Sequence, residues 1–400
     1  MRSFDPALLR LGGAPNIMRE ISAHGKERAK AVGAENVLDL SLGDPSVPPP
    51  PEVERVIRAC AGGRHGYSPA MGDPECRAML AQKLSARFGG DYRAEDLYIT
   101  LGASGALCLC FRALSGPGAE FVLQAPFFSE YTVFIEGNGG TPVIVVPNDE
   151  TFGLNLPGIE AAIGPNTAGV VVDLPNNPAG TICTRAEAAA LAELLRRKEE
   201  QYGRPIYLIS DEPYRELVYD GAYVPWFPAL YADTLVCYSY SKALSLAGER
   251  VGYLLVAPAA ARREELWNAL QGAGRVLGYI AAPYTFQRVA AQCEGLTADL
   301  SVYGTNRDLL YGGLTALGYE CVKPMGTFYM LVKAPEGDGV AFSRRAMERD
   351  LLVAPTEGFH CPGYVRLAYC CETETARRAL EVFRALRESG APREKTSVHT

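Results

Sequence analysis

One lysine, in the stretch SYSKALSLAGERVGY (239–253), stands where it could do chemistry. Lys242 follows an apolar run, and Arg250 comes eight positions later between two glycines. A desolvated lysine is a nucleophile towards carbonyl groups and forms Schiff bases. A nearby arginine supplies a permanent charge in a planar fork that suits a phosphate group. Since most lysines are exposed, Lys242 taken alone predicts only a surface residue, so its neighbours must decide.

Other polar groups also follow apolar runs that are typical of strands. These groups are the turn Gly102-Ala103-Ser104 after LYIT (97–100), Asn177 after GVVVD (169–173), Asp211 with Tyr214 after IYLIS (206–210), and Ser239 with Lys242 at the end of TLVCYS (234–239). In an open α/β sheet, ligands gather outside the carboxyl ends of the strands. We therefore expect these side chains to lie close together.

The set predicts a site for pyridoxal 5′-phosphate (PLP). A carboxylate such as Asp211 can hold a pyridinium nitrogen, which makes the ring an electron sink. Tyr214 and Asn177 could reach the phenolate-like oxygen of the same ring. The turn GASGAL resembles a helix N-terminus that binds anions, and Ser104, Ser239 and Arg250 could add phosphate contacts. Taken singly, Asp211 could be a cap and NNPAG an ordinary turn.

The elements that must position these residues read as an α/β fold. Further apolar runs occur at FVLQ (121–124), VIVV (143–146) and GYLLVA (252–257), and helical stretches such as 185–201 lie between several of them. Near-continuous apolar strands that alternate with helices indicate a buried, mostly parallel sheet. Residues 300–400 alternate helices with hairpin-like strands, which predicts a smaller α+β domain.

Length and composition set further bounds. Four hundred residues exceed a usual single core, so two domains are expected. The net charge of −7 argues against a general nucleic-acid binder, and no apolar run approaches the roughly 20 residues that span a bilayer. The N-terminus does not read as a signal peptide, and the eleven scattered cysteines favour a reducing cytoplasm. The cysteines and four histidines show no metal-ligand spacing, so no metal site is expected.

The combined motifs resemble those of class I/II aminotransferases of PLP fold type I. NNPAG, DEPY, and S-x-S-K followed by G-x-R-x-G carry the resemblance. Further segments that resemble the family's motifs follow in the expected order, namely APNIMREI (14–21), SLGDPSVPPP (41–50), GYSPAMGDPECR (66–77), QAPFFSEY (124–131), GTFYM (326–330) and YVRLAY (364–369). The resemblance implies a mostly parallel seven-stranded sheet in a large PLP-binding domain (49–290). It also implies an N-terminal arm with part of the small domain (1–48) and a C-terminal small domain (291–400).

The resemblance also implies a role for each matching position. Lys242 would form the Schiff base, Asp211 would pair with the pyridinium, and Asn177 and Tyr214 would contact the ring oxygen. Ala103, Ser104, Ser239 and Arg250 would bind the phosphate, with Gly102 in the same turn. Phe128 would stack on the ring, or Phe127 if the register slips by one. Substrate contacts would come from Arg366 on the α-carboxylate, and from Gly43, Asn177 and Ile17. Tyr67 would reach the cofactor phosphate of a partner subunit, which implies a homodimer with shared active sites.

The implied reaction moves an amino group between an L-amino acid and a 2-oxo acid, in ping-pong fashion through pyridoxamine phosphate. The same residues also serve PLP-dependent C–S β-lyases and other PLP chemistry, and a non-catalytic PLP-binding protein is a further alternative. The sequence leaves the substrate open. A distal carboxylate would need a second cation, for which Arg19, Arg64 and Arg275 are candidates without a motif. Aromatic residues could instead suit an apolar side chain, although core packing explains most of them.

Overall fold

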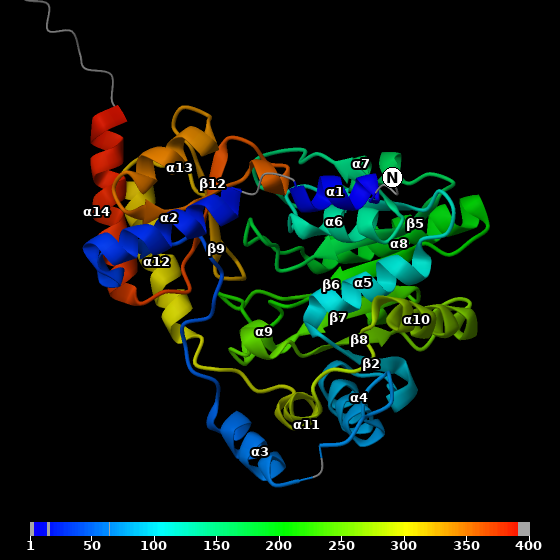
Figure 1. The fold of residues 1–400 in the computed structure, drawn as a ribbon. Helices are drawn as coiled ribbons and strands as arrows, with labels where there is room; N and C mark the ends of the chain where they lie inside the picture. Colours follow the sequence, from blue (N-terminus) through cyan, green and yellow to red (C-terminus); the bar gives the residue numbers. More distant parts are fainter. Residues whose placement is uncertain (1–3, 14–16, 64, 391–400) are drawn as a thin grey trace, which may run out of the picture. The chain divides into compact units, whose positions relative to one another are not determined.

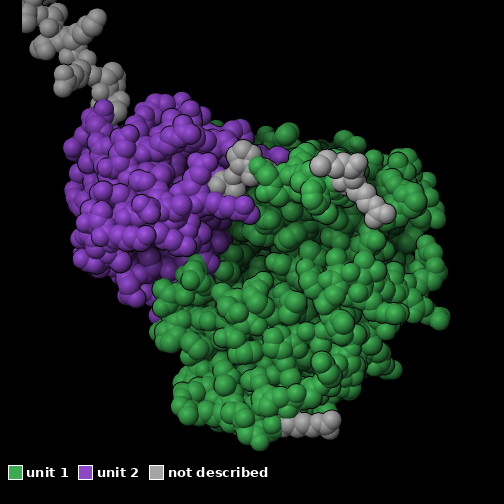
Figure 2. All heavy atoms as spheres, in the orientation of Figure 1, with its two compact units in different colours: residues 1–15, 44–300, 324–327 green, residues 16–43, 301–323, 328–400 purple. Residues whose placement is uncertain are grey.

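The computed structural model describes residues 4–13, 17–63 and 65–390, which form two compact units (Figure 2). Unit 1 comprises the described parts of residues 1–15, 44–300 and 324–327, and unit 2 those of 16–43, 301–323 and 328–400. Unit 1 thus takes in the described part of residues 1–15 together with residues 44–48, 291–300 and 324–327, all of which lie outside the range 49–290 expected for the large domain.

A seven-stranded sheet forms the centre of unit 1 (Figure 1). Its strand order is β2-β8-β7-β6-β5-β3-β4, and β8 alone runs antiparallel to its neighbours. The strands are β2 (Leu97–Thr100), β3 (Glu120–Gln124), β4 (Thr141–Val145), β5 (Thr167–Asp173), β6 (Tyr207–Asp211), β7 (Thr234–Ser239) and β8 (Gly252–Val256). The expected mostly parallel sheet is confirmed, and each apolar run named above coincides with one strand.

Side-chain alternation assigns each strand residue to one face of the sheet. Val171, Ile209 and Cys237 belong to a core that includes residues of α5, α6 and α10. Val172 and Leu208 belong to a core on the opposite face, which includes residues of α7 and α8. This alternation decides where the polar residues at the strand ends point. Asp211 lies two residues after Ile209, so its side chain projects towards the α5 face.

Ten helices of the described chain belong to unit 1. They are α1 (Pro6–Gly13), α3 (Pro51–Ala61), α4 (Pro74–Phe88), α5 (Gly102–Leu114), α6 (Glu130–Gly137), α7 (Leu156–Ala162), α8 (Arg185–Tyr202), α9 (Tyr240–Ala243), α10 (Arg263–Leu277) and α11 (Tyr284–Cys293). Local signals set their ends. Helix α8, for example, begins with a capping box between Thr184 and Glu187 and ends at Gly203, whose φ of 65° suits glycine.

Unit 2 has an α+β architecture. Its helices are α2 (Ile17–Val32), α12 (Ser301–Ala316), α13 (Gly339–Met347) and α14 (Thr373–Gly390). An antiparallel sheet of order β11-β12-β9 is formed by β9 (Tyr329–Lys333), β11 (Ala354–Pro355) and β12 (Tyr364–Ala368). A separate parallel pair joins β1 (Leu38–Asp39) to β10 (Leu351–Leu352). No helix within residues 4–13, 17–63 or 65–390 has the length and apolar character needed to span a membrane.

A four-residue segment, 324–327, returns late in the chain to complete unit 1. Backbone N–H groups of Met325 and Thr327 donate hydrogen bonds of 2.8 Å to the carbonyl oxygens of Gly180 and Leu217, respectively. Gly326 also forms an antiparallel bridge with Val218. This segment, called the return segment below, therefore joins the NNPAG turn to the chain that follows Asp211.

Candidate active site

The N-terminus of α5 forms a cradle with two other segments of unit 1. Gly102 starts the helix with a φ of 72°, and a Cβ built on it would lie 3.3 Å from Nη2 of Arg250 and 3.4 Å from Oγ of Ser239. Gly252 allows the close approach, since a Cβ there would lie 2.9 Å from Cα of Gly102. A helix N-terminus, a guanidinium and a hydroxyl group thus converge at one point. That combination suits a phosphate group.

Local structure holds the cradle in place. Arg250 adopts the left-handed conformation, with a φ of 53°, and its Nη1 donates a 2.9 Å hydrogen bond to the carbonyl oxygen of Ala247. Ser239 caps α9, and its Oγ lies 2.7 Å from Oγ of Ser241. The structure thus brings together the predicted residues Gly102, Ser239 and Arg250. It adds Ser241, which stands inside the S-x-S-K motif but is not among the residues predicted from the sequence.

Lys242 lies at the carboxyl edge of the sheet, in the short helix α9 that follows β7. Its side chain is half-buried, and Nζ lies 6.0 Å from the ring centroid of Tyr214. Tyr214 itself is buried in the segment that follows β6. The expectation that strand ends gather these residues therefore holds for Lys242 and Tyr214.

Asp211 ends β6, and its carboxyl group is buried. Its Oδ2 accepts a 2.6 Å hydrogen bond from the hydroxyl group of Tyr131 in α6. Its Oδ1 is also buried and has no hydrogen-bond partner among the described residues. Burial raises the pKa of Asp211 to about 7, and the hydrogen bond from Tyr131 opposes that rise. A buried acceptor of this kind fits a positively charged N–H donor.

The described residues therefore fit PLP in three respects. The cradle at Gly102 suits its phosphate, and the buried Oδ1 of Asp211 suits its protonated ring nitrogen. Lys242, from a strand end of the same sheet, supplies the amine that its aldehyde needs.

The NNPAG turn is hydrogen-bonded both to the end of β5 and to the aromatic segment QAPFFSEY. Asn177 is buried, and its backbone N–H donates a 3.1 Å hydrogen bond to Oδ2 of Asp173 at the end of β5. The neighbouring side chain, Asn176, donates through Nδ2 to the carbonyl oxygen of Pro126 at 3.0 Å. It also accepts a hydrogen bond from the backbone N–H of Ala179 at 2.9 Å. Asn176 thus fixes the aromatic segment QAPFFSEY relative to the turn.

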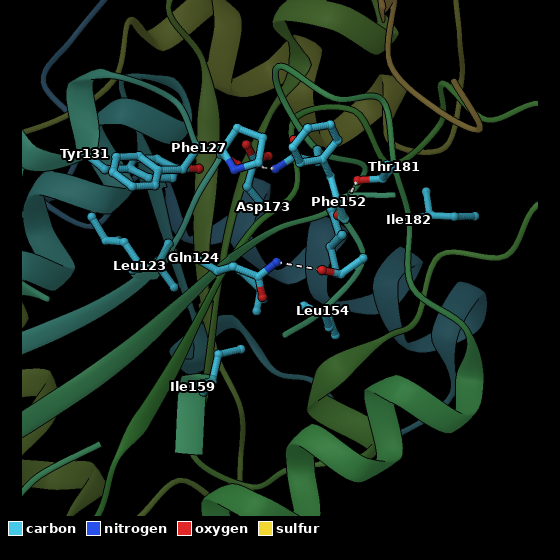
Figure 3. A pocket seen from close by; sticks show the side chains of 16 residues that line it. Leu123, Gln124, Phe127, Tyr131, Phe152, Leu154, Ile159, Asp173, Thr181 and Ile182 are labelled. Atoms are coloured by element: carbon cyan, nitrogen blue, oxygen red, sulfur yellow. Dashed lines mark hydrogen bonds between the residues drawn. The ribbon is translucent and has the colours of Figure 1, made fainter. Parts of the chain in front are cut away.

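The two adjacent phenylalanines occupy different environments. Phe127 is only 2% exposed and stacks on Tyr131, with ring centroids 6.0 Å apart and an interplanar angle of 16°. It lines a pocket together with Tyr131 and Asp173 (Figure 3). Phe128 is half-buried and meets Tyr131 edge-on at 5.7 Å. A ring that stacks on a cofactor needs one accessible face, so the geometry favours Phe128 for that role.

Tyr67 is fully exposed within the single chain. The segment that carries it is nonetheless held firmly, by the completely buried side chain of Gln287 in α11. Gln287 donates through Nε2 to Ser68 Oγ at 3.0 Å and to the carbonyl oxygen of Ala282 at 2.6 Å. It also accepts from the backbone N–H of Asp73 at 2.7 Å. Nothing in the sequence singles out this glutamine.

Unit 2 contains the predicted substrate residues Arg366 and Gly43. Arg366 lies on β12, is 5% exposed, and donates from Nη2 to the carbonyl oxygen of Ser41 at 2.7 Å. Its guanidinium carbon lies 4.2 Å from the ring centroid of Tyr329 and 4.9 Å from that of Phe359. A Cβ on Gly43 would collide with the hydroxyl group of Tyr329. Arg366 is thus a buried arginine beside the Ser41–Gly43 backbone, not an exposed residue on the surface of the strand.

The remaining predicted positions are less informative. Ala103 is buried and Ser104 half-buried in the first turn of α5. Ile17 is half-buried at the start of α2, and residues 14–16 of the expected arm lie outside the described residues. Among the candidate cations for a distal carboxylate, Arg19 and Arg275 are exposed, and Arg64 also lies outside the described residues.

Sequence reasoning missed two buried groups beside Asp211. From the sequence, Tyr131 in QAPFFSEY is one of the aromatic residues that could suit an apolar substrate side chain, whereas the structure makes it the hydrogen-bond donor to Asp211. Asp173 was not considered at all. It ends the apolar strand β5 just as Asp211 ends β6, and the two are register partners. The signal was available, because a carboxylate at the end of a buried strand needs a reason to be there.

Comparisons with known proteins identify the sequences and folds to which the chain is similar. A family model described as aminotransferase class I and II matches residues 35–383. The chain is 32% identical over 365 residues to an aspartate/prephenate aminotransferase of Thermus thermophilus, covering 87% of this chain and 90% of the relative. It is 29% identical over 372 residues to a probable N-acetyl-LL-diaminopimelate aminotransferase of Bacillus subtilis, covering 91% and 93%.

Two solved structures extend the comparison to the fold. An amino transferase from Eubacterium rectale shares 43% identity and superposes with a TM-score of 0.94, covering 98% of this chain and 100% of the other. An aspartate aminotransferase from Thermus thermophilus, solved with maleate, shares 28% identity with a TM-score of 0.84, covering 96% and 100%.

Proposed function

The chain belongs to the aminotransferase class I and II family and is a PLP-dependent aminotransferase, and from this premise we propose which residues carry its reaction. One observation carries the assignment: Gly102, Ser239 and Arg250 converge to form a phosphate cradle. The same unit holds Asp211, whose buried Oδ1 is available as a hydrogen-bond acceptor. Ala103 and Ser104 contribute to the same cradle through the first turn of α5. The half-buried Phe128 is proposed to stack on the ring, with Phe127 as its support.

Bound PLP supplies an electron sink for the charge that develops at the substrate Cα. The protein contributes the proton transfers. Nζ of Lys242 removes the Cα proton of the amino acid and returns a proton in the opposite half-reaction. Asp211 would accept a hydrogen bond from the protonated ring nitrogen, while Tyr131 keeps the carboxylate oriented. Asn177 and Tyr214 would donate hydrogen bonds to the ring oxygen.

The substrates are an amino acid and a 2-oxo acid, and we propose that Arg366 binds the α-carboxylate that both share. A guanidinium binds a carboxylate in bidentate fashion, and stacking on Tyr329 and Phe359 limits its side-chain freedom. Gly43, Asn177 and Ile17 are the other residues proposed to contact the substrate.

A second carboxylate on the substrate is a further part of the proposal. The names of the Thermus and Bacillus relatives refer to aspartate, prephenate and N-acetyl-LL-diaminopimelate, all of which carry more than one carboxylate. One solved Thermus structure contains maleate, a dicarboxylate. L-Aspartate and L-glutamate are therefore the proposed amino donors.

We also propose a homodimer in which Tyr67 reaches the cofactor phosphate of the partner subunit. Tyr67 is fully exposed although its segment is fixed, and Ile280, 60% exposed, lies two residues from the Ala282 carbonyl that Gln287 binds. Exposed apolar and aromatic residues on a rigid surface are typical of an interface. Sedimentation of the holoenzyme should give a dimer mass; a monomer at micromolar concentration would overturn this part.

The eleven cysteines are all free thiols, which supports the proposed cytoplasmic location.

Half-reactions test the function directly. The holoenzyme is mixed with single amino acids, and the cofactor absorbance is followed until a 2-oxo acid restores the starting spectrum. L-Aspartate or L-glutamate should give a complete, reversible change that Lys242→Ala abolishes, although the variant still binds PLP. Release of pyruvate and ammonia from cystathionine would instead identify a β-lyase. PLP binding without any spectral change would identify a non-catalytic protein.

A further inference from the structure

Asp173 and Asp211 occupy matching positions on adjacent strands. They are Cα partners in the parallel register of β5 and β6, and each is the last residue of its strand. Partners in this register project from the same face of a sheet. Val171 and Ile209, two residues earlier, both face the core that includes residues of α5 and α6, so the two carboxyl groups also point to that side. The sheet therefore places two carboxyl groups side by side.

Both carboxyl groups are buried, with residue exposures of 7% for Asp173 and 5% for Asp211. Each uses one oxygen in a hydrogen bond: Oδ2 of Asp173 accepts from the N–H of Asn177, and Oδ2 of Asp211 accepts from the hydroxyl group of Tyr131. The Oδ1 atom of each has no hydrogen-bond partner among the described residues. The ion pairs that arginines form in the described part of unit 1 go to other carboxylates, such as Glu216, Glu212 and Asp96. Two neighbouring buried anions without a cation would repel each other strongly.

We propose that Asp173 and Asp211 act as a carboxyl pair that keeps a proton on Asp173 and releases it when a protonated ring nitrogen binds to Asp211. Asp173 is then a positioning residue, since it acts on the cofactor through Asp211. The proposal rests on the PLP site proposed above. It adds a second carboxyl group to a role that the sequence assigned to Asp211 alone.

The charges around the pair support this order of ionisation. Burial, followed by the negative charge of Asp211, raises the pKa of Asp173 well above its usual range. Asp211 is the partner that ionises first, because the hydroxyl group of Tyr131 stabilises its anion and the pKa rises only to about 7, whereas the N–H of Asn177 does not offset the larger rise at Asp173. A pyridinium cation would favour the ionised form of both carboxyl groups, so its binding expels a proton from Asp173.

The other titratable groups near the pair do not supply the missing charge. Tyr131 of α6 and Cys237 of β7 have pKa values raised well above their usual ranges by burial, so both are neutral. Glu212 follows Asp211 but is paired with Arg215 and hydrogen-bonded to Ser210. The NNPAG turn contributes the N–H of Asn177. Lys242 of α9 lies at the same edge of the sheet, and its amine is proposed to meet the cofactor aldehyde. The cofactor nitrogen is therefore the cation proposed for this pair.

Proton counting tests the proposal without turnover. Pyridoxamine 5′-phosphate is titrated into the apoprotein by calorimetry, in buffers of different ionisation enthalpy, between pH 6.5 and 8.5. The wild type should release between about 0.3 and about 1 more proton per bound cofactor than Asp173→Asn near pH 7.5. Affinity at neutral pH should change less than about tenfold, because asparagine resembles the protonated aspartic acid. By linkage, the affinity of the wild type should rise with pH relative to that of the variant.

Asp91→Asn, at an exposed aspartate paired with Arg93, is the matched control and should release as many protons as the wild type. Equal proton counts for the wild type and Asp173→Asn would overturn the proposal, as would a much larger loss of affinity at neutral pH. Infrared difference spectra compare the wild-type apoprotein with the wild type bound to pyridoxamine phosphate. This measurement needs no variant, so a folding defect of Asp173→Asn cannot affect it. The carbonyl band of a protonated carboxyl group should disappear on loading, and its absence from the apoprotein would overturn the proposal. Failure of the wild type to bind pyridoxamine phosphate would contradict the PLP site itself.

Discussion

The hydroxyl group of Tyr131 lies 2.6 Å from Oδ2 of Asp211, and this hydrogen bond joins α6 to the end of β6. It is the one hydrogen bond that the Asp211 side chain makes among the described residues. The bond directs the carboxylate and leaves Oδ1 available. It also keeps the pKa of a buried carboxyl group lower than burial alone would allow.

Tyr131→Phe should therefore weaken cofactor binding in a pH-dependent way. Without the hydrogen bond, the pKa of Asp211 rises further, so less of the anion is present at neutral pH. Hydrogen bonds to charged groups contribute about 1.5–3 kcal/mol, so about tenfold weaker binding of pyridoxamine phosphate is expected at pH 7, with partial recovery at pH 8.5. Tyr207→Phe, which removes a hydroxyl group bonded to the carbonyl oxygen of Ala261, is the control. A pH-independent loss would mean that Tyr131 acts only through packing.

Gly102→Ala should damage the phosphate cradle more than the fold. The added Cβ would crowd Nη2 of Arg250 and Oγ of Ser239. Gly118→Ala is matched, because its φ of 75° imposes similar backbone strain while a Cβ there meets nothing within 4 Å. Both variants should lose about 1 kcal/mol of unfolding free energy. Only Gly102→Ala should bind pyridoxamine phosphate at least about tenfold more weakly, with little effect on pyridoxamine, which lacks the phosphate.

Arg250→Ala should weaken retention of PLP. Its guanidinium is the cation of the cradle, and charge-assisted contacts to phosphate are about twice as strong as neutral ones. We expect at least about tenfold faster cofactor loss on dialysis against phosphate-free buffer. Arg262 is a useful control, because it is an exposed arginine with a φ of 49° that pairs with Glu265 instead. Equal retention of PLP by Arg250→Ala and Arg262→Ala would show that Arg250 does not bind the cofactor phosphate.

The stability of the apoprotein should fall as pH rises. Burial raises the pKa of Asp211 above the value near 4 of the unfolded chain, so the folded state holds its proton more tightly. The resulting stabilisation is present at acidic pH and is lost between about pH 4 and pH 7. Asp211→Asn removes this dependence, so the wild type should lose roughly 2–4 kcal/mol more than the variant between pH 5 and pH 8. Urea unfolding of both apoproteins gives the comparison, and parallel pH profiles would contradict it.

Strands were the most predictable part of the fold. Apolar runs such as TLVCYS and LYIT coincide with β7 and β2, because a strand buried on both faces must be apolar throughout. The sheet order was not predictable from such runs, since pairing between β8 and its neighbours depends on contacts far apart in sequence. The division of the chain into units was not predictable for the same reason, since the return segment belongs to unit 1 through contacts with residues far away in the sequence.

The site was predictable where the chemistry demands a residue type at a strand end. Lys242, Asp211 and Arg250 are of this kind. Its supporting residues were not, because Tyr131, Asn176 and Gln287 act by where the fold places their polar atoms. A glutamine with three hydrogen bonds in a buried position looks, in sequence, like any other glutamine. Asp173 lies between these cases, since its position at a strand end was visible but its partner was known only from the register.

The return segment has a consequence for how the protein is made. The Gly180 and Leu217 carbonyl groups leave the ribosome long before Met325 and Thr327, which bind them. A nascent chain that ends at residue 300 has all seven strands of the sheet, yet the turn after Asn177 still lacks its closing contacts. Because domains fold largely in the order of synthesis, the sheet can form early. The NNPAG turn must wait for residues 325–327, which follow a stretch of chain that belongs to the other unit, so its hydrogen bonds are completed only after part of unit 2 has been made.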